Sequence, residues 1–573
     1  MVKNNKIKIK IDGKEYLAKK GQTILEIAQS NNIFIPSLCH HPDLNIKANC
    51  RVCVVEVKGC RSLMTSCSVI AEDGIEVLTN SAKVKKSRDV NLKLIFSAHV
   101  EKCPTCTLRF NCELLKLARK YKIKVASFDD RKTKRKTYKF ANSVEIDGSQ
   151  CIDCRNCVDS CSDIQKIDYL EIKGRGIKQE IVPSEDKNID CIYCGQCTLR
   201  CPVASAQEQN NWPEVEDILV NKGKKTVIAV IAPSTRITIG EEFGLPYGQN
   251  NSGKMVTALK ELGFDQVIDV VFGADITTLV EAEELLERLN NKGSKAPMIT
   301  SCCPAWVKYL EFYRPDLIAH LTSSRSPQIH LGGIIKTYWA QEKKIKPEDI
   351  MVVAIMPCTA KKFESQREEL KIGKLYPIDK VITVRELAFL IKKNNIDFAN
   401  LKPQRSNDLI NDGSSAGLIY GASGGVMESA LRTASHWLCD SKKGICRSRL
   451  EFKGVRGMEG VKEAQVNLAG KKLKVAVVNG IGNIAGVLDS INKYHYIEVM
   501  ACPGGCIGGG GQPIPSSREI VRKRTAGIYR GDKKGVIRTA HDNIGAVSIF
   551  DWVKKNKLEK KIFHTKYIKK DKK

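Results

Sequence analysis

The chain has 573 residues, of which 42% are hydrophobic and 27% are charged, a composition typical of globular proteins and not of disordered ones. Its length predicts several domains, roughly three to four. No stretch approaches the ~18 consecutive apolar residues of a membrane span, because the longest apolar runs, such as 227–232, have the length of a strand. The Lys-rich start lacks the apolar segment of a secretory signal, so we expect a cytoplasmic protein without a membrane span.

Charge and cysteine content are unusual. The chain has 93 Lys and Arg against 64 Asp and Glu, a formal net charge of +29. Such a surplus favours acidic partners or nucleic acid, but the lysines are spread along the chain, and we expect no nucleic-acid partner. The 23 cysteines, without a secretory signal, indicate metal ligands rather than disulfides.

The segment 1–80 resembles a β-grasp domain. Isoleucines alternate with lysines over 7–11 and lead to Asp12-Gly13, a strong hairpin signal. Thr23 then opens a predicted helix over 24–31. The next four thiols suit a 2Fe–2S cluster on loops around this domain, although their spacing differs from the plant type, and a structural zinc ion is the alternative. They are Cys39, Cys50, Cys53 and Cys67.

Two blocks of four cysteines form the only internal repeat that we find. They read Cys151-x2-Cys154-x2-Cys157-x3-Cys161 and Cys191-x2-Cys194-x2-Cys197-x3-Cys201. In two-cluster ferredoxins the fourth cysteine of each block ligates the other cluster. We therefore assign one 4Fe–4S centre to Cys151, Cys154, Cys157 and Cys201, and a second to Cys191, Cys194, Cys197 and Cys161. Paired zinc sites are the alternative.

A third pattern, His99-x3-Cys103-x2-Cys106-x5-Cys112, precedes these blocks. Its spacing suits either a zinc ion with three thiolates and one imidazole or a 4Fe–4S cluster with one imidazole ligand. Without further context the spacing favours zinc. Three more cysteines have no partner set and are interpreted as structural or free thiols: Cys60, Cys439 and Cys446.

Beyond about residue 212, apolar strands alternate with helical segments, as is typical of α/β domains with largely parallel sheets. Strands are predicted over 226–231, 298–300, 351–356, 474–478 and 496–500. Three of them lead directly to cysteines, namely Cys302 and Cys303, Cys358, and Cys502 followed by Cys506. Ligands collect at the carboxyl ends of strands in open α/β sheets, so these thiols are expected to converge on one buried point. Glycines at 504–505 and 508–511 would let the backbone approach a bulky inorganic cofactor closely.

The three segments that follow these strands resemble the signature motifs of the iron-iron (FeFe) hydrogenases. They read TSCCPAW at 300–306, MPCTAKKFE at 356–364 and EVMACPGGCIGGGGQP at 498–513. The resemblance covers essentially the whole chain, because long forms of this family carry the same order of N-terminal clusters. It implies an H-cluster, a 4Fe–4S cubane joined through a cysteine sulfur to a two-iron subsite that carries CO, cyanide and azadithiolate.

Carried over residue by residue, the resemblance implies that Cys303, Cys358, Cys502 and Cys506 hold the cubane, and that Cys506 bridges to the two-iron subsite. It implies Cys302 as the first proton relay and Lys361, supported by Glu364, as a hydrogen-bond donor to a cyanide. Further residues are expected to bind the cofactor in the pocket: Pro233, Ser234, Gln328, Met356, Tyr420 and Met500. Tyr420 departs from the family pattern, in which phenylalanine is expected.

The implied proton path runs through Cys302, Glu281, Thr322, Glu284 and Arg288. Glu281, Glu284 and Arg288 share one face of a predicted helix, because they lie at i, i+3 and i+7. From the residues alone this face is expected to be solvated, since it lies opposite an apolar stripe, and the resemblance reverses that preference. Thr322 stands where serine is typical and keeps the hydroxyl group.

The resemblance also implies that the site of His99, Cys103, Cys106 and Cys112 holds a 4Fe–4S cluster and not the zinc ion that the spacing favours. The expected cofactors are then one 2Fe–2S cluster, three 4Fe–4S clusters and the H-cluster. The expected fold class is α+β and α/β multidomain. Its expected domains are a 2Fe–2S β-grasp domain at 1–80, a His/Cys3 cluster domain at 81–140, a two-cluster ferredoxin-like domain at 141–210 and a two-lobed α/β H-cluster domain at 211–573.

The implied activity is reversible H2 oxidation and proton reduction, with the clusters as an electron wire. Expected partners are H2 and protons, with either ferredoxin or NAD(P)H-oxidising subunits. No Gly-x-Gly-x2-Gly follows a strand in a way that indicates a nucleotide site in this chain. One alternative is an electron-transfer subunit similar to the large subunit of respiratory NADH dehydrogenase, which would not need the thiols after the strands. The other is a hydrogen sensor or an iron–sulfur assembly factor, of which the sensor is disfavoured by Cys302, Lys361, Glu281 and Glu284.

Overall fold

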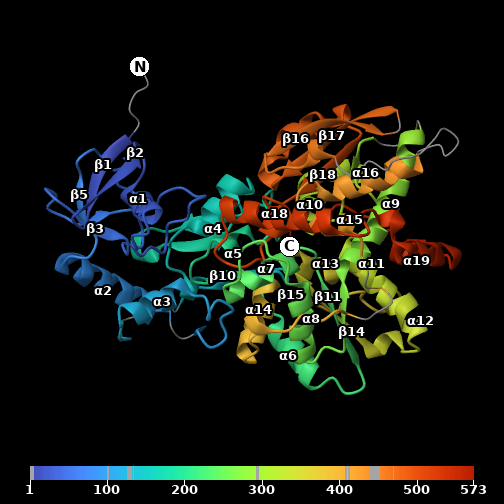
Figure 1. The fold of residues 1–573 in the computed structure, drawn as a ribbon, viewed down its shortest axis with the longest axis horizontal. Coiled ribbons are helices and arrows are strands. Elements are labelled where there is room, and N and C mark those ends of the chain that lie inside the picture. Colours follow the sequence, from blue (N-terminus) through green and yellow to red (C-terminus); the bar gives the residue numbers. More distant parts are fainter. Residues whose placement is uncertain are drawn as a thin grey trace.

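The computed structural model describes residues 6–99, 102–125, 132, 134–291, 296–406, 410, 413–438, 452–468 and 470–572. The molecule is elongated, with the N-terminal strands at one end and the residues beyond about 210 in the larger body at the other (Figure 1). Cys439 and Cys446 lie outside the described residues.

The first strands form the predicted hairpin. β1 (Lys6–Ile11) pairs antiparallel with β2 (Lys14–Lys19), and both turn residues have positive φ, 47° at Asp12 and 84° at Gly13, as the favoured two-residue hairpin turn requires. The sheet has the order β2-β1-β5-β3-β4. Its other strands are β3 (Val54–Val57), β4 (Met64–Thr65) and β5 (Glu76–Leu78). The predicted helix is confirmed as α1 (Ile24–Ser30), which begins at a capping box between Thr23 and Glu26.

The middle of the chain begins with two helices and continues with short strands around the cysteine blocks. Its elements are α2 (Ala82–Ser97), α3 (Glu113–Lys120), β6 (Thr137–Phe140), β7 (Val144–Asp147), α4 (Asn156–Asp159), β8 (Leu170–Lys173), β9 (Glu180–Pro183), α5 (Gln196–Leu199) and β10 (Ala206–Glu208). Helices α4 and α5 each follow a residue with positive φ, Arg155 at 64° and Gly195 at 67°. The repeat seen in the sequence is therefore also a structural repeat. The β6–β7 hairpin spans residue 140, the expected boundary between two domains.

The larger body contains two four-stranded sheets (Figure 1). In the first, all strands are parallel in the order β12-β11-β14-β15. Its strands are β11 (Thr226–Ile231), β12 (Gln266–Asp269), β14 (Ile350–Met356) and β15 (Lys380–Thr383). The second has the order β13-β18-β17-β16, in which only β16 is antiparallel. Its strands are β13 (Met298–Ile299), β16 (Val461–Leu468), β17 (Lys471–Asn479) and β18 (Tyr496–Met500). The five predicted strands are confirmed, with β13 one residue shorter and β14 and β17 longer than expected.

Helices cover both faces of the first sheet. Alternate residues of β11 explain why, since Val227 and Ala229 pack in one hydrophobic cluster with α6, α8 and α14, whereas Ile228 and Val230 pack in another with α9, α11 and α19. These helices are α6 (Trp212–Val220), α8 (Ser252–Glu261), α9 (Val270–Asn290), α11 (Pro327–Ile334), α14 (Val384–Lys393) and α19 (Ile544–Lys555). Other helices of the body are α7 (Thr235–Thr238), α10 (Pro304–Tyr313), α12 (Ala340–Glu342), α13 (Ala360–Ser365), α15 (Ser415–Leu418), α16 (Gly425–Trp437), α17 (Ala485–Asp489), α18 (Arg518–Lys534) and α20 (Glu559–Ile562).

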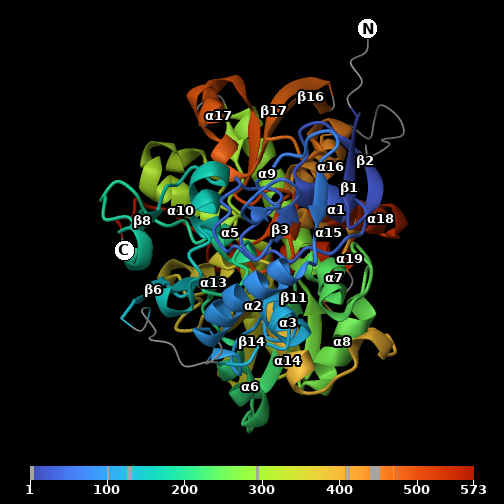
Figure 2. The same ribbon diagram turned by 90° about the vertical axis from the view of Figure 1, so that its left-hand side faces the viewer.

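Seen from the N-terminal end, α2 and α3 lie together on the near face of the molecule (Figure 2). Within the described ranges, no helix is long and apolar enough to cross a lipid bilayer.

Candidate functional site

A cavity lies where the carboxyl ends of β13, β14 and β18 meet. It has about 740 Å³ of empty space, counted with its open mouth. All five thiols that follow these strands line it, as do all six pocket residues expected from the sequence and Lys361. The wall is almost wholly apolar apart from these groups, and its residues come from both sheets. The geometry therefore brings together segments that lie far apart in the chain, from Pro233 to Cys506.

The thiols of the cavity are close enough to affect one another. Burial raises the pKa of Cys358 and so do the neighbouring thiols of Cys303 and Cys506. Burial likewise raises the pKa of Cys502, with Cys358, Cys303 and Cys506 among its neighbours. Several buried thiols close together are costly to ionise, because their negative charges would repel one another away from water. Binding to a metal cluster offsets this cost, because the cluster stabilises the thiolates.

Polar side chains at the cavity have unused hydrogen-bonding capacity. Ser234 is fully buried and its hydroxyl has no partner, and Oε1 of Gln328 also lacks one. Lys361 donates from Nζ to Oε2 of Glu364 at 2.7 Å and to the carbonyl oxygen of Cys302 at 3.0 Å. Burial alone would lower the pKa of Lys361, but the Glu364 carboxylate raises it, so the lysine stays charged. The hydroxyl of Ser234 and the ammonium group of Lys361 can donate to a bound group that carries hydrogen-bond acceptors, and Oε1 of Gln328 can accept from a donor on it.

The expected proton residues are gathered along α9, and their helix face is not solvated. Glu281 is fully buried, and burial raises its pKa to about 8. Oε2 of Glu284 accepts from the hydroxyl of Thr322 at 2.7 Å, and its other oxygen pairs with Arg288. The solvated face favoured by the residues alone is thus wrong, because the second sheet and the loop that carries Thr322 cover α9. Among the described residues, no hydrogen bond joins Glu281 to Thr322 or Glu284.

Three residues near this path were missed by sequence reasoning. Tyr496 of β18 donates to Oε2 of Glu281 at 2.9 Å. Ser323 donates to Glu284 at 3.0 Å and bonds Nδ1 of His564 at 2.9 Å. Tyr496 follows the alternation of a buried strand, and Ser323 and His564 lie in loops, so none of them carries a local sequence signal.

The phenol of Tyr420, which stands where phenylalanine was expected, is bonded within the protein. Its oxygen lies 3.0 Å from Oγ1 of Thr278, which in turn lies 2.7 Å from Oγ of Ser429. The ring lines the cavity, while the hydroxyl group is held between α9 and α16.

The duplicated cysteine blocks are crossed in space. Burial raises the pKa of Cys157, and so do the neighbouring thiols of Cys154, Cys151 and Cys201, with a smaller effect from Cys197. Burial likewise raises the pKa of Cys191, and so do the neighbouring thiols of Cys194, Cys197 and Cys161. Each group of four thus contains the last cysteine of the other block, which is the arrangement expected of two ferredoxin-type clusters.

The two N-terminal sets also converge. Cys50 donates its backbone N–H to Sγ of Cys39 at 3.4 Å. A hydrogen bond with Cys53 raises the pKa of Cys67, and so do burial and the thiols of Cys39 and Cys50. Burial raises the pKa of Cys106 to about 12, with Cys112 and Cys103 nearby.

His99 is held as a neutral imidazole. Its ring is buried, and burial lowers its pKa to about 4. Nδ1 lies 3.1 Å from the carbonyl oxygen of Gln150, and the Val203 backbone also lies within hydrogen-bond reach of the ring. A proton on Nδ1 that is donated to Gln150 would leave the Nε2 lone pair for a metal. No described hydrogen bond joins His99 to Cys103, Cys106 or Cys112. Across the described residues, no three His, Cys, Asp or Glu side chains are close enough to hold one single ion.

The second cysteine block lies against the cavity. Sγ of Cys502 is 3.9 Å from the carbonyl oxygen of Cys194. A Cβ on Gly510 would lie 2.5 Å from that same oxygen, and a Cβ on Gly195 would lie 3.0 Å from Cα of Gly510. The expectation that Gly510 makes room for a cofactor is therefore wrong, because the backbone of residues 194 and 195 packs against it. Gly505 and Gly509, in contrast, do line the cavity.

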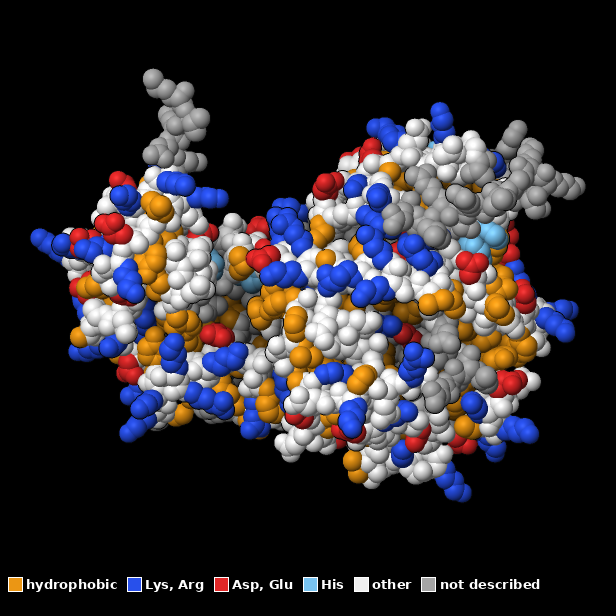
Figure 3. Space-filling model, in the orientation of Figure 1, with side chains coloured by type: hydrophobic (Ala, Val, Ile, Leu, Met, Phe, Trp, Pro, Cys, Tyr) orange, Lys and Arg blue, Asp and Glu red, His pale blue; other side chains and the backbone are white. Residues whose placement is uncertain are grey.

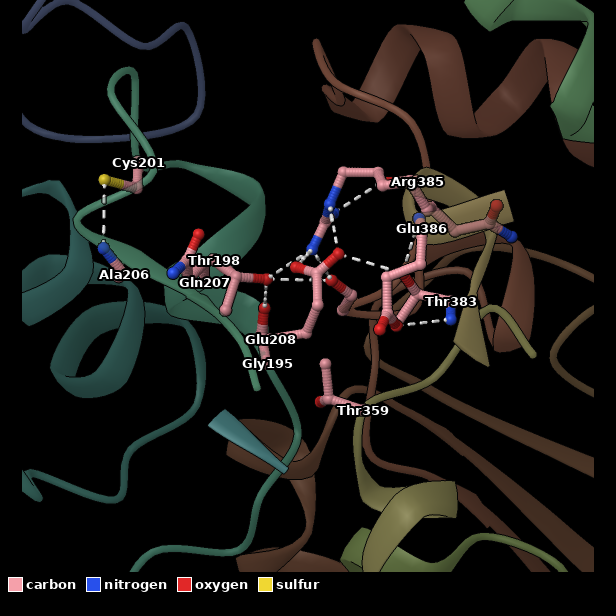
Figure 4. A network of polar contacts seen from close by, with 12 residues as sticks. Gly195, Thr198, Cys201, Ala206, Gln207, Glu208, Thr359, Thr383, Arg385 and Glu386 are labelled. Atoms are coloured by element: carbon pink, nitrogen blue, oxygen red, sulfur yellow. Dashed lines mark hydrogen bonds and ion pairs between the residues drawn. The ribbon is translucent and has the colours of Figure 1, made fainter. Parts of the chain in front are cut away.

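A buried polar network fastens this contact (Figure 4). Arg385 of α14 forms an ion pair with Glu208 of β10, with side chains 2% and 1% exposed. Its guanidinium also donates to the carbonyl oxygens of Gly510 at 2.8 Å and Gln512 at 2.6 Å. The hydroxyl of Thr198 donates to Gly510 as well, at 2.8 Å. The arginine thus joins the ferredoxin-like segment, the first sheet and the loop after Cys506.

Comparisons with known proteins agree with this architecture. Residues 225–510 match the family described as iron only hydrogenase large subunit, C-terminal domain, and residues 4–82 match the 2Fe-2S iron-sulfur cluster binding domain. The NADP-reducing hydrogenase subunit HndD of Solidesulfovibrio fructosivorans is 38% identical over 98% of this chain and 98% of its own length. Iron hydrogenase 1 of Clostridium pasteurianum is 38% identical over 94% of this chain and 95% of its own length.

A solved structure has the same fold in the larger body. A variant of the FeFe-hydrogenase HydA1 of Chlamydomonas reinhardtii matches 63% of this chain and 99% of its own with a TM-score of 0.56 and 34% sequence identity. The agreement extends from the 2Fe–2S domain matched at residues 4–82 of this chain to the thiol-lined cavity between the two sheets. The chain therefore belongs to the FeFe hydrogenases, as a long form with a mixed α/β, multidomain fold, an N-terminal 2Fe–2S domain and the H-cluster domain at which this family metabolises H2.

Proposed function

We propose that this chain interconverts H2 with protons and electrons and relays the electrons through its N-terminal clusters. The observation that carries the proposal is the cavity in which five thiols, Lys361 and two unpartnered polar groups converge. Cys303, Cys358, Cys502 and Cys506 would hold the cubane of the H-cluster, Lys361 and Ser234 would donate hydrogen bonds to ligands of the two-iron subsite, and Gln328 would line its pocket. When bound, that subsite supplies the metal centre at which protons and electrons combine to H2.

The residues of the chain exclude water and move protons. Cys302 is buried, and burial together with the neighbouring Glu281 raises its pKa, so the thiol holds its proton until a strong acceptor is present. The pKa of Glu281 is raised to about 8. A value this close to neutral pH suits a group that accepts and returns protons. We propose that protons reach Cys302 from the surface through Arg288, Glu284, Thr322 and Glu281, with side-chain motion or water bridging the step between Thr322 and Glu281.

We propose one 2Fe–2S cluster at residues 1–80, one 4Fe–4S cluster with His99 at 81–140, two at 141–210, and the H-cluster at 211–573. The crossed thiols of the two blocks and the neutral tautomer of His99 support these ligand sets. The contact of Cys502 with Cys194 supports electron transfer between the second block and the H-cluster. Thiols that surround a space without meeting at one point suit clusters better than single ions.

Ferredoxin or an NAD(P)H-oxidising subunit is the proposed partner. The name of the relative HndD, an NADP-reducing hydrogenase subunit, supports a pyridine-nucleotide link, which another chain would have to supply. A cytoplasmic location is proposed from the cysteine content.

The first experiment measures H2 formation from reduced methyl viologen by anaerobic protein that carries its complete cofactors. Cys302→Ser is expected to keep the infrared bands of bound CO and cyanide and lose nearly all activity, because a serine hydroxyl gives up its proton far less readily than a thiol. Cys60→Ser is the matched control, since Cys60 is an exposed free thiol. Absence of H2 from the fully loaded parent would overturn the enzyme proposal, and full activity in Cys302→Ser would overturn the relay.

A further inference from the structure

We propose that helices α2 and α3 form the docking surface for a small acidic iron–sulfur carrier protein, and that its electrons enter at the cluster of Cys103, Cys106 and Cys112. This rests on the proposed function and identifies both the class of partner and the cluster at which its electrons enter. In each transfer the carrier loses one electron, and the cluster held by His99 and the three cysteines gains it.

The positive charge of the chain is concentrated here. Residues 81–125, which include α2 and α3, contain 12 Lys and Arg but only 3 Asp and Glu. This stretch of 45 residues has a net charge of +9, whereas the other 528 residues together carry +20. The lysines are spread along the chain, but the net positive charge is not, because few acidic residues accompany them here. A field of one sign over one face attracts and orients partners of the opposite sign.

Most basic side chains of this segment face solvent, although Arg88 is buried and Lys93 is half-buried. The exposed ones in the two helices and the residues after each are Lys83, Lys85, Lys86, Lys102, Arg109, Lys116, Arg119, Lys120, Lys122 and Lys124. Of these, within the described residues, only Lys102 and Lys116 form ion pairs. Blue side chains accordingly outnumber red ones over the lower left of Figure 3, where α2 and α3 lie in Figure 1. Charges without internal partners remain available to an acidic protein.

Apolar side chains lie within this basic surface. Val90 and Leu94 stand one turn apart on the outer side of α2 and are 49% and 46% exposed. Phe34, at 50% exposure, lies under the ammonium group of Lys120, 3.5 Å from its ring centre. An apolar centre with a charged rim is the usual composition of a protein–protein contact, and for weak redox encounters the contact is small.

The thiols beneath this surface are also the most accessible of the N-terminal sets. Cys103 and Cys106 are partly exposed, and they lie between the two basic helices in the chain. All four thiols of the 2Fe–2S set are buried, with exposures from 1% to 8%. Electron transfer between proteins requires that the two centres approach closely, so the partly exposed set is the better port.

The test compares two fourfold charge reversals in cofactor-loaded enzyme. The first combines Lys85→Glu, Lys86→Glu, Arg119→Glu and Lys124→Glu. The control combines Lys402→Glu, Lys472→Glu, Lys493→Glu and Lys555→Glu, which are exposed residues of the larger body. Both sets lower the net charge by 8, and each includes one residue from the last turn of a helix, Arg119 of α3 and Lys555 of α19.

Binding is measured by calorimetry with an acidic two-cluster 4Fe–4S ferredoxin in a redox-inert, gallium-substituted form, and turnover is measured with the native ferredoxin and with methyl viologen. The first set is expected to raise Kd and KM for ferredoxin by roughly tenfold or more at low salt, and the control set by less than about twofold. Added salt should weaken binding to the parent, since a Debye length of ~10 Å at 0.1 M falls to ~3 Å at 1 M. Rates with methyl viologen should not change.

Equal weakening by both sets would overturn the proposal, since net charge alone would then explain the binding. Unchanged binding in the first set would also overturn it, as would tighter binding of a short RNA duplex than of ferredoxin. Because the calorimetric arm needs no turnover, it decides the docking surface even if no variant forms H2, and loss of methyl viologen activity in the parent would count against the proposed function alone.

Discussion

Tyr496 donates a hydrogen bond of 2.9 Å to Oε2 of Glu281, whose other carboxyl oxygen has no partner in the described structure. The pair joins β18 of the second sheet to the middle of α9, and both side chains are fully buried. Burial raises the pKa of Glu281 to about 8, although the Tyr496 hydroxyl lowers it. The carboxyl group is therefore neutral at pH 7 and has one oxygen free to exchange a proton.

The ionisation of Glu281 should be visible by infrared spectroscopy. The carbonyl band of its protonated carboxyl group is expected to disappear as the pH rises through about 8, and Glu281→Gln identifies the band. Tyr496→Phe removes a donor that favours the carboxylate, so the loss should move to higher pH. A band already absent at pH 6 would contradict the assignment.

The same group makes stability depend on pH. Its folded pKa of about 8 lies above the ordinary value of 4.5, so it contributes stability that is fully present below pH 4.5 and is lost as the pH rises through about 8. Glu281→Gln should therefore show a smaller decline in stability across this range, measured by chemical unfolding at several pH values. An unchanged decline would show that other groups control it.

The ion pair of Arg385 and Glu208 should be essential to the joint between the ferredoxin-like segment and the larger body. Arg385→Met leaves the Glu208 carboxylate buried without its partner, which costs about 3–5 kcal/mol, and frees the carbonyl oxygen of Gly510. The melting temperature should fall well below that of Arg314→Met, where the ion pair is exposed. Equal effects would mean that the buried pair adds nothing to the joint.

Glu364 is expected to matter for the cavity and not only for stability. Glu364→Gln removes the carboxylate that raises the pKa of Lys361 and keeps the buried lysine charged, so the charge beside the cavity should change and the cyanide bands of the loaded protein should shift. Glu386→Gln breaks a neighbouring and more deeply buried Lys–Glu pair, that of Lys362 and Glu386, neither of which lines the cavity. It should lower stability and leave the bands unchanged. A similar spectral shift in both variants would contradict the role of Glu364.

Gly510 should tolerate no side chain, because its added Cβ would lie 2.5 Å from the carbonyl oxygen of Cys194. Gly510→Ala is expected to cost about 1–3 kcal/mol and to weaken the magnetic coupling between reduced centres, measured by electron paramagnetic resonance. Gly486→Ala is the control, since nothing lies within 4 Å of its Cβ and its helical position favours alanine. Unaltered coupling in Gly510→Ala would show that the two backbones can separate without consequence.

Much of the architecture was predictable from local sequence patterns. The alternation of residues 7–11 and the Asp12-Gly13 turn led to the correct hairpin, and the apolar run 226–231 matches β11. The convergence of the strand-end thiols followed from the general position of ligands in α/β sheets, and the cavity contains all five. In both cases the signal depends on residues adjacent in the chain or on a rule of topology.

Contacts between distant segments were not predictable in this way. The face of α9 that carries Glu281 looks solvated by helical period alone, and its burial depends on β18, a strand that comes much later in the chain. The glycines after Cys506 suggested room for a cofactor, yet Gly510 admits the backbone of Gly195. The pairing of Arg385 with Glu208 likewise becomes apparent only when two domains are in contact.

The crossing of the two cysteine blocks has a consequence for chain breakage. Cys201 lies with the first group of thiols and Cys161 with the second, so a cut anywhere between residues 161 and 191 leaves each fragment with three thiols of its own group and a single thiol of the other. On the proposed ligand sets, neither fragment alone would hold the four ligands of a cluster, and neither block could be transplanted alone into another protein. The smallest transferable unit of this stretch is the pair.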